Sequence, residues 1–314
     1  MRSNSSDVTV GRAIRISFGI VVFAAAVYVI FRQFEQYELQ SGDIVRNLRT
    51  IPMPRVLASM LCIILDYLVM TNYDRLALQY IRGTKPPRPN PLLAFIGQTF
   101  TINTNFLIGT SIRHRLYSRL GLSLSESTTL STFSFTSFIF GFLFIGGIVF
   151  LVEPVLLPQF LHVPFGSVRI LGALFLAAIL VYLIASALQI RLVRVHKWHI
   201  SIPSIHIAWR QILFSSIDWL FTSSALYLLL PLQSILLFPA FLGTFLVASL
   251  LGQVSQAPAG IGVFEAAMLV TLSGSATASS VLGSLIVFRV LYFFIPLLIG
   301  IGSFLSLEFY TQKN

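Results

Sequence analysis

The chain is 314 residues long, 56% of them hydrophobic and 10% charged, and it carries a formal net charge of +10. Soluble domains have about 25% charged residues, so the polar side chains here are too few to cover a water-soluble particle. The basic residues lie in short segments between apolar runs, a distribution that the positive-inside rule explains without a nucleic-acid partner. The single cysteine, Cys62, excludes an intramolecular disulfide bond.

Long apolar runs predict the secondary structure, and several reach the roughly 20 residues that a helix needs to cross the hydrocarbon core of a bilayer. The predicted fold class is an all-α integral membrane protein, a polytopic helical bundle. We expect a single transmembrane domain over residues 1–314, without a soluble catalytic domain. The predicted helices cover residues 12–31, 56–78, 92–110, 127–152, 168–190, 208–230, 234–256, 259–273 and 279–308.

The first apolar run, within residues 12–31, follows the basic residues Arg2, Arg12 and Arg15. This arrangement is shared by signal peptides and by uncleaved first spans. We favour an uncleaved span, because the small-residue cluster at residues 24–26 lies inside the apolar run rather than after it. By the positive-inside rule, the same arginines place the N-terminus in the cytoplasm.

The run over residues 92–110 conflicts with a full crossing of the membrane. Arg113 and Arg115 follow it directly, and the positive-inside rule keeps them on the cytoplasmic side from which the run enters. A re-entrant hairpin resolves the conflict. The polar side chains of Asn103 and Asn105 suit its break, because non-helical backbone at membrane depth is tolerated only beside protein or a water-filled cavity.

A second break is predicted at residues 252–262, a stretch rich in glycine and polar residues inside a very apolar region. The helix predicted after it, residues 259–273, is short for a membrane span. We interpret this region as a second re-entrant hairpin that enters from the outer side.

Two short motifs recur in the two halves of the chain. Residues 66–68 read Asp-Tyr-Leu and residues 218–220 read Asp-Trp-Leu, and an Ala-Phe-x-Gly motif follows in each half. The predicted helices that carry the aspartates run in opposite directions. This pattern indicates two inverted repeats, residues 1–152 and 168–314, of the kind that enclose a site near the membrane midplane. The alternative is chance matching among apolar triplets.

Four ionisable residues fall inside predicted helices: Asp66, Asp218, Glu265 and Arg289. Such groups are costly in a membrane and usually face the protein interior or a cavity. Asp218 and Glu265 are the obvious carboxylate partners of Arg289, since no other charge lies between Asp218 and Arg289 except Glu265. The sequence leaves open whether these residues form an ion pair that fixes helix packing or line a polar track through the membrane.

The segment with Pro258, Gly260, Gly262 and Glu265 is typical of a helix that begins inside the membrane. The free N–H groups and the positive dipole end of such a helix favour an anion, such as a lipid phosphate. Glu265 lies in the first turn and is an alternative partner for the same N–H groups.

Arg113 and Arg115 lie in a basic segment with interleaved aromatic residues. One interpretation is that they only fix the topology. The other is that they capture phosphate, which arginine binds with two parallel hydrogen bonds.

Motifs of enzymes and metal sites are scarce. His196 and His199 lie in a basic loop without a carboxylate or cysteine to complete a metal site. The sequence shows no phosphate-binding glycine loop and no nucleophile elbow. We therefore expect no metal, no cofactor and no catalytic residues.

The sequence resembles a known family at two signatures. Residues 111–118, Ser-Ile-Arg-His-Arg-Leu-Tyr-Ser, resemble the first signature of the lysylphosphatidylglycerol synthase transmembrane family, which includes flippase domains. Residues 258–265 resemble the second signature, and residues 288–296 look like the family's bacterial inner-membrane members of this length. The resemblance covers nearly the whole chain. The positions that match the two signatures are Arg113, Arg115, Pro258, Gly260, Gly262 and Glu265.

The resemblance implies translocation of phospholipids between the leaflets of the bacterial inner membrane, with an anionic headgroup in a midplane cavity and both termini in the cytoplasm. Family members that make lysyl-lipids carry a soluble aminoacyltransferase domain after the membrane part. This chain stops at Asn314, so we expect no lipid synthesis by it. The expected partners are anionic phospholipids, a second copy of the chain or a lipid-synthesis enzyme. The alternatives are a partner subunit of a lipid-modifying enzyme, and a membrane enzyme acting on headgroups.

Overall fold

The computed structural model describes residues 51–83, 90–104, 106–152, 168–189, 202–231, 236–255, 258–272 and 275–311. All of them belong to one compact unit, Asn47–Asn314. Every regular element within the described ranges is helical, which confirms the all-α fold class. The helix predicted over residues 12–31 lies outside the described residues.

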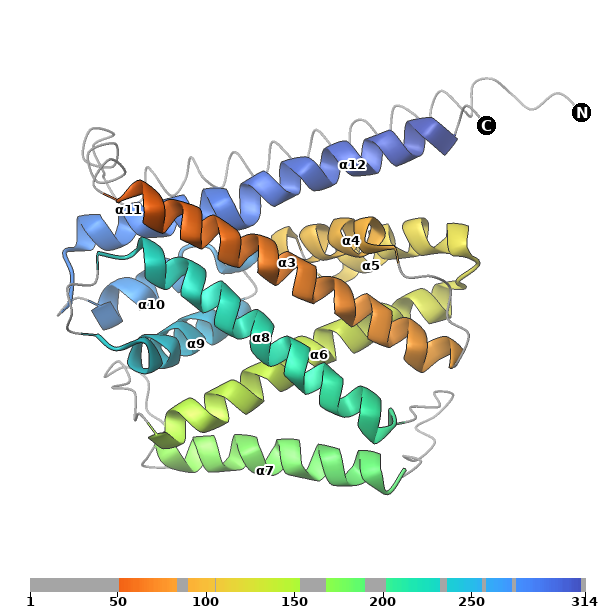
Figure 1. The fold of residues 1–314 in the computed structure, drawn as a ribbon, viewed down its shortest axis with the longest axis horizontal. Coiled ribbons are helices and arrows are strands. Elements are labelled where there is room, and N and C mark those ends of the chain that lie inside the picture. Colours follow the sequence, from red (N-terminus) through yellow and green to blue (C-terminus); the bar gives the residue numbers. More distant parts are fainter. Residues whose placement is uncertain are drawn as a thin grey trace, which may run out of the picture. The chain divides into compact units, whose positions relative to one another are not determined.

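Ten α-helices and three short turns of other helix types follow one another along the described ranges (Figure 1). The short turns are the 3-10 turns η1 (Ser118–Leu120) and η2 (Pro258–Gly260) and the π-helical turn η3 (Val290–Phe294). The α-helices are α3 (Met53–Arg82), α4 (Pro91–Asn103), α5 (Phe106–Tyr117), α6 (Leu124–Val152), α7 (Val168–Ala187), α8 (Ile205–Leu229), α9 (Phe238–Val254), α10 (Val263–Leu272), α11 (Ala278–Arg289) and α12 (Ile295–Thr311).

Five helical segments of the described chain are long and apolar enough to cross a membrane: α3, α6, α7, α8 and the continuous stretch Ala278–Phe309 through α11 and α12. The helices α4 and α5 have 13 and 12 residues, and α9 and α10 have 17 and 10. A crossing needs about 20 residues. The chain is therefore a multi-pass membrane protein in which short helices alternate with long ones.

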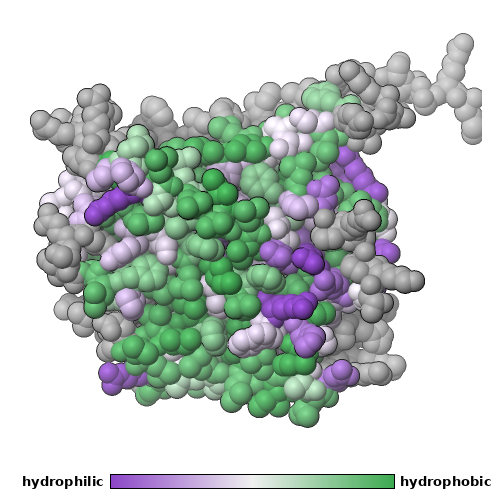
Figure 2. Space-filling model, in the orientation of Figure 1, coloured by the Kyte–Doolittle hydropathy of each residue, from purple (hydrophilic) through white to green (hydrophobic). Residues whose placement is uncertain are grey.

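The surface of this unit has an apolar belt. Figure 2 shows hydrophobic residues across the middle of the face and hydrophilic patches gathered toward its left and right edges. On α3 the exposed residues Leu57, Leu61, Ile64 and Leu68 recur every three or four positions, which places them along one side of the helix. Such a stripe suits contact with lipid tails.

Several helix ends follow from local sequence. Asn90 caps α4, because its side-chain oxygen accepts a hydrogen bond of 3.0 Å from the Leu92 N–H, and Pro91 occupies the first helical position. Ser123 and Glu126 form a capping box at the start of α6. The Ser123 N–H donates to Glu126 over 2.8 Å, and the Glu126 N–H donates to Ser123 Oγ over 3.2 Å.

The helices α3 and α8 pack against each other in opposite directions. Ser59 near the start of α3 donates a hydrogen bond of 2.8 Å to the Ala225 carbonyl near the end of α8, and Tyr73 further along α3 donates to Asp218 further back in α8. Both helices are long and apolar enough to cross a membrane, so residues at their midpoints are expected to lie far from either polar edge.

The helices α4 and α5 form an antiparallel pair. A Cβ atom added to Gly97 would lie 2.7 Å from Arg113 Cγ, and one added to Gly109 would lie 2.8 Å from Thr101 Cα. These close approaches fall symmetrically about the break at Thr104, where the backbone leaves the helical region with φ −121° and ψ −98°. The single helix predicted over residues 92–110 is therefore wrong, whereas the break predicted near Asn103 is confirmed.

The helix predicted over residues 279–308 is interrupted by the π-helical turn η3, which the sequence analysis did not foresee. Pro296 has no backbone N–H, so the Tyr292 carbonyl four residues earlier has no helical donor. The Tyr67 hydroxyl of α3 donates to that carbonyl over 3.0 Å. The proline thus explains the irregular hydrogen bonding, and a side chain from α3 satisfies the freed carbonyl.

Candidate functional site

Asp66 and Asp218, which the sequence analysis assigned to equivalent places in the two halves, meet at the contact between α3 and α8. Their residues are 0% and 2% exposed. The Thr222 hydroxyl lies between the two carboxyl groups, 3.0 Å from Asp66 Oδ2 and 3.4 Å from Asp218 Oδ1. The two carboxyl groups therefore share one small polar site, near the middle of two membrane-spanning helices.

Two tyrosine hydroxyl groups donate hydrogen bonds to this carboxyl pair. Tyr292 of η3 donates to Asp66 Oδ2 over 2.9 Å, and Tyr73 of α3 donates to Asp218 Oδ2. Asp66 Oδ1 is buried and finds no hydrogen-bond partner among the described residues. None of the described ion pairs involves either aspartate.

Arg113 is buried rather than displayed at the membrane surface, with its residue only 1% exposed. It forms an ion pair with Asp74 of α3, with Nη2 3.3 Å from Oδ1. Two side chains of α4 hold the remaining donors: Thr101 accepts from Nη1 over 2.8 Å, and Gln98 accepts from Nη2. In this structure the guanidinium of Arg113 is therefore occupied by protein partners, and phosphate capture, one of the two interpretations from the sequence, stays a prediction.

Asp74 was missed by the sequence analysis. It accepts hydrogen bonds from Tyr117 over 2.8 Å and from Ser134 over 3.1 Å, besides its ion pair with Arg113. The signal that would have found it is its spacing from Asp66, because residues eight positions apart lie on one face of a helix.

Glu265 and Arg289 form a third buried cluster. Arg289 Nε lies 2.6 Å from Glu265 Oε1, and Arg289 Nη1 donates to the Ala259 carbonyl over 2.7 Å. The second carboxylate oxygen of Glu265 accepts from the Gly262 N–H over 2.8 Å. Gly262 has φ +84°, which favours glycine at this turn. The ion pair therefore closes the start of α10, as one of the two interpretations predicted.

The expected pairing of Arg289 with Asp218 is not observed, since Arg289 pairs with Glu265 and is also held against the rings of Phe264 and Phe293. Pro258 and Gly260 form the turn η2 directly before α10. Glu265 accepts from the Gly262 N–H directly before α10, so this one donor is not available to a lipid phosphate.

Arg115 lies at the polar edge, on the opposite side of α5 from Arg113. It forms two parallel hydrogen bonds of 2.8 Å with Glu308 of α12, and Arg119 also pairs with Glu308. The side chains of Arg115 and Arg119 are 39% and 30% exposed. We call Arg115, Arg119 and Glu308 the edge cluster; Glu308 was not singled out from the sequence.

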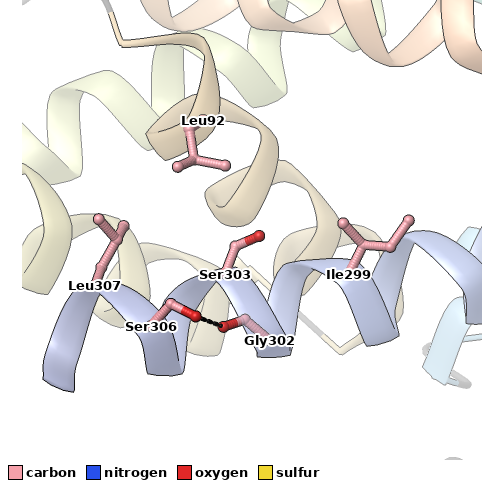
Figure 3. A pocket seen from close by; sticks show the side chains of 6 residues that line it. All are labelled: Leu92, Ile299, Gly302, Ser303, Ser306 and Leu307. Atoms are coloured by element: carbon pink, nitrogen blue, oxygen red, sulfur yellow. Dashed lines mark hydrogen bonds between the residues drawn. The ribbon is translucent and has the colours of Figure 1, made fainter. Parts of the chain in front are cut away.

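A groove runs along α12 up to the edge cluster. It has a volume of about 550 Å³ and is open on one side. Figure 3 shows Leu92 of α4 across the groove from the side chains of α12. The groove reaches Leu307, whose carbonyl accepts from Arg119 over 3.4 Å. Its lining residues are Leu92, Ile299, Gly302, Ser303, Ser306 and Leu307.

The remaining predicted site residues are asparagines. The Asn103 side-chain amide donates a hydrogen bond of 2.9 Å to the Thr99 carbonyl, so it satisfies a backbone group in the last turn of α4. Asn105 lies outside the described residues. The described part of the chain contains no group of three or more side chains suited to a metal ion.

The predicted site residues thus separate into the carboxyl pair, two buried ion pairs and the edge cluster.

Comparison with known proteins identifies the family. Residues 16–300 match the family described as the lysylphosphatidylglycerol synthase TM region. The chain belongs to this family. The family assignment confirms the resemblance seen at the two signatures. The matched region contains all three buried clusters, whereas most residues that line the groove follow it in the chain.

Two relatives match most of the chain. The protein slr0712 of Synechocystis is 31% identical over 303 residues, which cover 95% of this chain and 94% of the relative. The inner membrane protein YbhN of Escherichia coli is 35% identical over 254 residues, which cover 80% of this chain and 79% of the relative. A phosphatidylglycerol lysyltransferase of Staphylococcus haemolyticus is 34% identical over 91 residues, or 28% of this chain and 11% of that enzyme.

Proposed function

We propose that this protein moves phospholipids with anionic headgroups between the two leaflets of the bacterial inner membrane. The observation that carries the proposal is the apolar groove along α12, which ends at the edge cluster. A phospholipid has the matching chemistry, because its acyl chains need apolar surface and its phosphate is bound well by arginine.

The charge of the edge cluster favours an anion. Arg115 and Arg119 both pair with the carboxylate of Glu308, and each is a cation of the kind that binds phosphate well. Both arginines keep exposed side-chain surface at the polar edge. A phosphate that approaches along the groove would therefore meet guanidinium groups that are partly exposed at the end of the groove.

Re-entrant helix pairs would give the headgroup a route past the apolar belt. Arg82 at the end of α3 donates a hydrogen bond of 2.8 Å to the Gly121 carbonyl, which follows α5. The end of α3, which precedes α4, and the residues that follow α5 therefore lie next to each other, as a re-entrant pair requires. Such interrupted helices expose backbone groups at membrane depth, where transporters place their sites.

Inverted repeats fit the same proposal. In the proposed pairing α3 corresponds to α8, and the short helices α4 and α5 correspond to α9 and α10. Asp66 and Asp218 are then equivalent residues, and they meet at the contact between the halves. We place the polar edge with Arg82, Arg115 and Arg119 in the cytoplasm by the positive-inside rule, together with both termini.

A leaflet-exchange assay tests the proposed function. Purified protein is placed in vesicles that hold a fluorescent phosphatidylglycerol, phosphatidylethanolamine or cardiolipin, and dithionite is added outside. We expect bleaching beyond the outer-leaflet fraction, fastest for the anionic lipids. In the Arg115→Gln/Arg119→Gln variant the rate should fall at least about tenfold, if each arginine contributes a charge-assisted hydrogen bond.

Arg82→Gln is the matched control, because Arg82 is an exposed arginine at the same edge that pairs with Glu126 and does not line the groove. It should exchange lipid at the wild-type rate. The proposal fails if the wild-type protein gives no exchange with or without a proton gradient, a result that would favour a partner-subunit role.

A further inference from the structure

We infer that Asp66 and Asp218 form a proton-binding site, in which the two carboxyl groups hold one proton between them at neutral pH. This site lies apart from the groove and the edge cluster. Proton binding does not depend on the proposed function, whereas a role in driving lipid movement rests on it.

The first argument is the cost of burial. A buried carboxylate needs a nearby cation or several hydrogen-bond donors to offset its lost hydration. Two carboxylates that share one site also repel each other, so one of them takes up a proton. Asp66 and Asp218 are both nearly fully buried and share the hydroxyl of Thr222.

The second argument is the set of groups that face the pair. From α3 they are Tyr67 and Tyr73, from α8 Thr222, and from η3 Tyr292, all of which are uncharged hydroxyl groups. Two arginines of the described residues are buried, and both have other partners, since Arg113 pairs with Asp74 and Arg289 pairs with Glu265. No cation of the described chain therefore pairs with Asp66 or Asp218.

The third argument comes from counting donors. Each hydroxyl has one proton to donate, so Thr222 serves only one of the two aspartates at a time. Tyr292 serves Asp66 Oδ2 and Tyr73 serves Asp218 Oδ2. Asp66 Oδ1 is left buried without a donor among the described residues, so a negative charge on Asp66 is poorly compensated and Asp66 is expected to favour the protonated form.

The location suits exchange of that proton. The pair joins α3, α8 and the π-helical turn η3, an irregular element of a type found often at functional sites. Both aspartates lie near the middle of membrane-spanning helices. A proton bound here would sit about halfway between the two membrane surfaces.

Infrared spectroscopy of the purified protein tests the inference directly. At pH 7 the wild-type spectrum should contain the carbonyl stretch of a protonated carboxylic acid, and that band should shift in D₂O. The band should disappear in both Asp66→Asn and Asp218→Asn. It should stay in the control Glu126→Gln, which removes an exposed carboxylate paired with Arg82.

Three results would overturn the inference. They are the absence of the band in the wild-type protein, its persistence in both aspartate variants, and its loss on adding sodium chloride but not choline chloride at constant pH. The last result would make the pair a sodium site. The readout needs no lipid transport, so a wild-type band without leaflet exchange would reject the proposed function and leave this inference standing.

Discussion

Arg289 is buried together with its partner Glu265, and this makes the effect of its removal predictable. The Arg289→Ala change would leave the Glu265 carboxylate buried without a cation, so we expect the free energy of unfolding to fall by about 3–5 kcal/mol. The double change Glu265→Ala/Arg289→Ala should cost less than the sum of the two single changes, because it leaves no unpaired charge. Equilibrium unfolding in mixed micelles measures both.

The exposed pair Arg82–Glu126 supplies the contrast at the same scale. The Arg82→Ala change should alter the free energy of unfolding by no more than about 1 kcal/mol, since water replaces the lost partner. Equal losses for Arg82→Ala and Arg289→Ala would contradict the assignment of Glu265–Arg289 as a buried pair.

The sequence identified most of the buried charges but only some of their partners. Asp66, Asp218, Glu265 and Arg289 stand out because each interrupts an apolar run. Asp74 escaped notice because it lies near the end of its predicted helix, where a charge is ordinary. The choice between Asp218 and Glu265 as the partner of Arg289 depends on how the helices are packed, and composition carries no information on that.

At the scale of helices, the break in the first short pair could be predicted and the π-helical turn was not. Polar side chains and a conflict in topology marked the break near Asn103. The only mark of the π-helical turn is Pro296, which follows it, and a proline inside an apolar helix predicts a disturbance without specifying its type.

The re-entrant path proposed for α4 and α5 predicts the accessibility of two positions. In a Cys62→Ser background, Asn90→Cys before α4 and Ser118→Cys after α5 should both react with a membrane-impermeant thiol reagent from the cytoplasmic side only. Thr277→Cys before α11 should react from the outer side only. All three residues are exposed in the structure.

The experiment compares labelling in intact spheroplasts with labelling in inside-out vesicles. Reaction of Asn90→Cys and Ser118→Cys from opposite sides would show that the pair crosses the membrane, and would contradict the re-entrant assignment. Thr277→Cys then serves to confirm the orientation of each preparation.

At the scale of the whole molecule, five segments of the described chain are long and apolar enough to cross a membrane, and the bundle holds three buried polar clusters, two of which are ion pairs. The edge cluster and its groove differ from these buried clusters, because they combine partly exposed arginines with an open apolar groove. The family assignment and the membrane location followed from the sequence. The groove could not be predicted from the sequence, because Leu92 and Ile299 are brought together only by the packing of α4 on α12.

Leaflet exchange by Gly302→Leu, compared with Gly302→Ala, tests the central claim most directly. A Cβ atom at Gly302 would meet nothing within 4 Å, so both variants should fold, but only the leucine fills the groove. We expect Gly302→Ala to exchange fluorescent phosphatidylglycerol at the wild-type rate. Gly302→Leu should be at least about tenfold slower, which corresponds to an increase of about 1.4 kcal/mol in the activation free energy of exchange. Equal rates for folded protein of both variants would contradict a lipid path along α12.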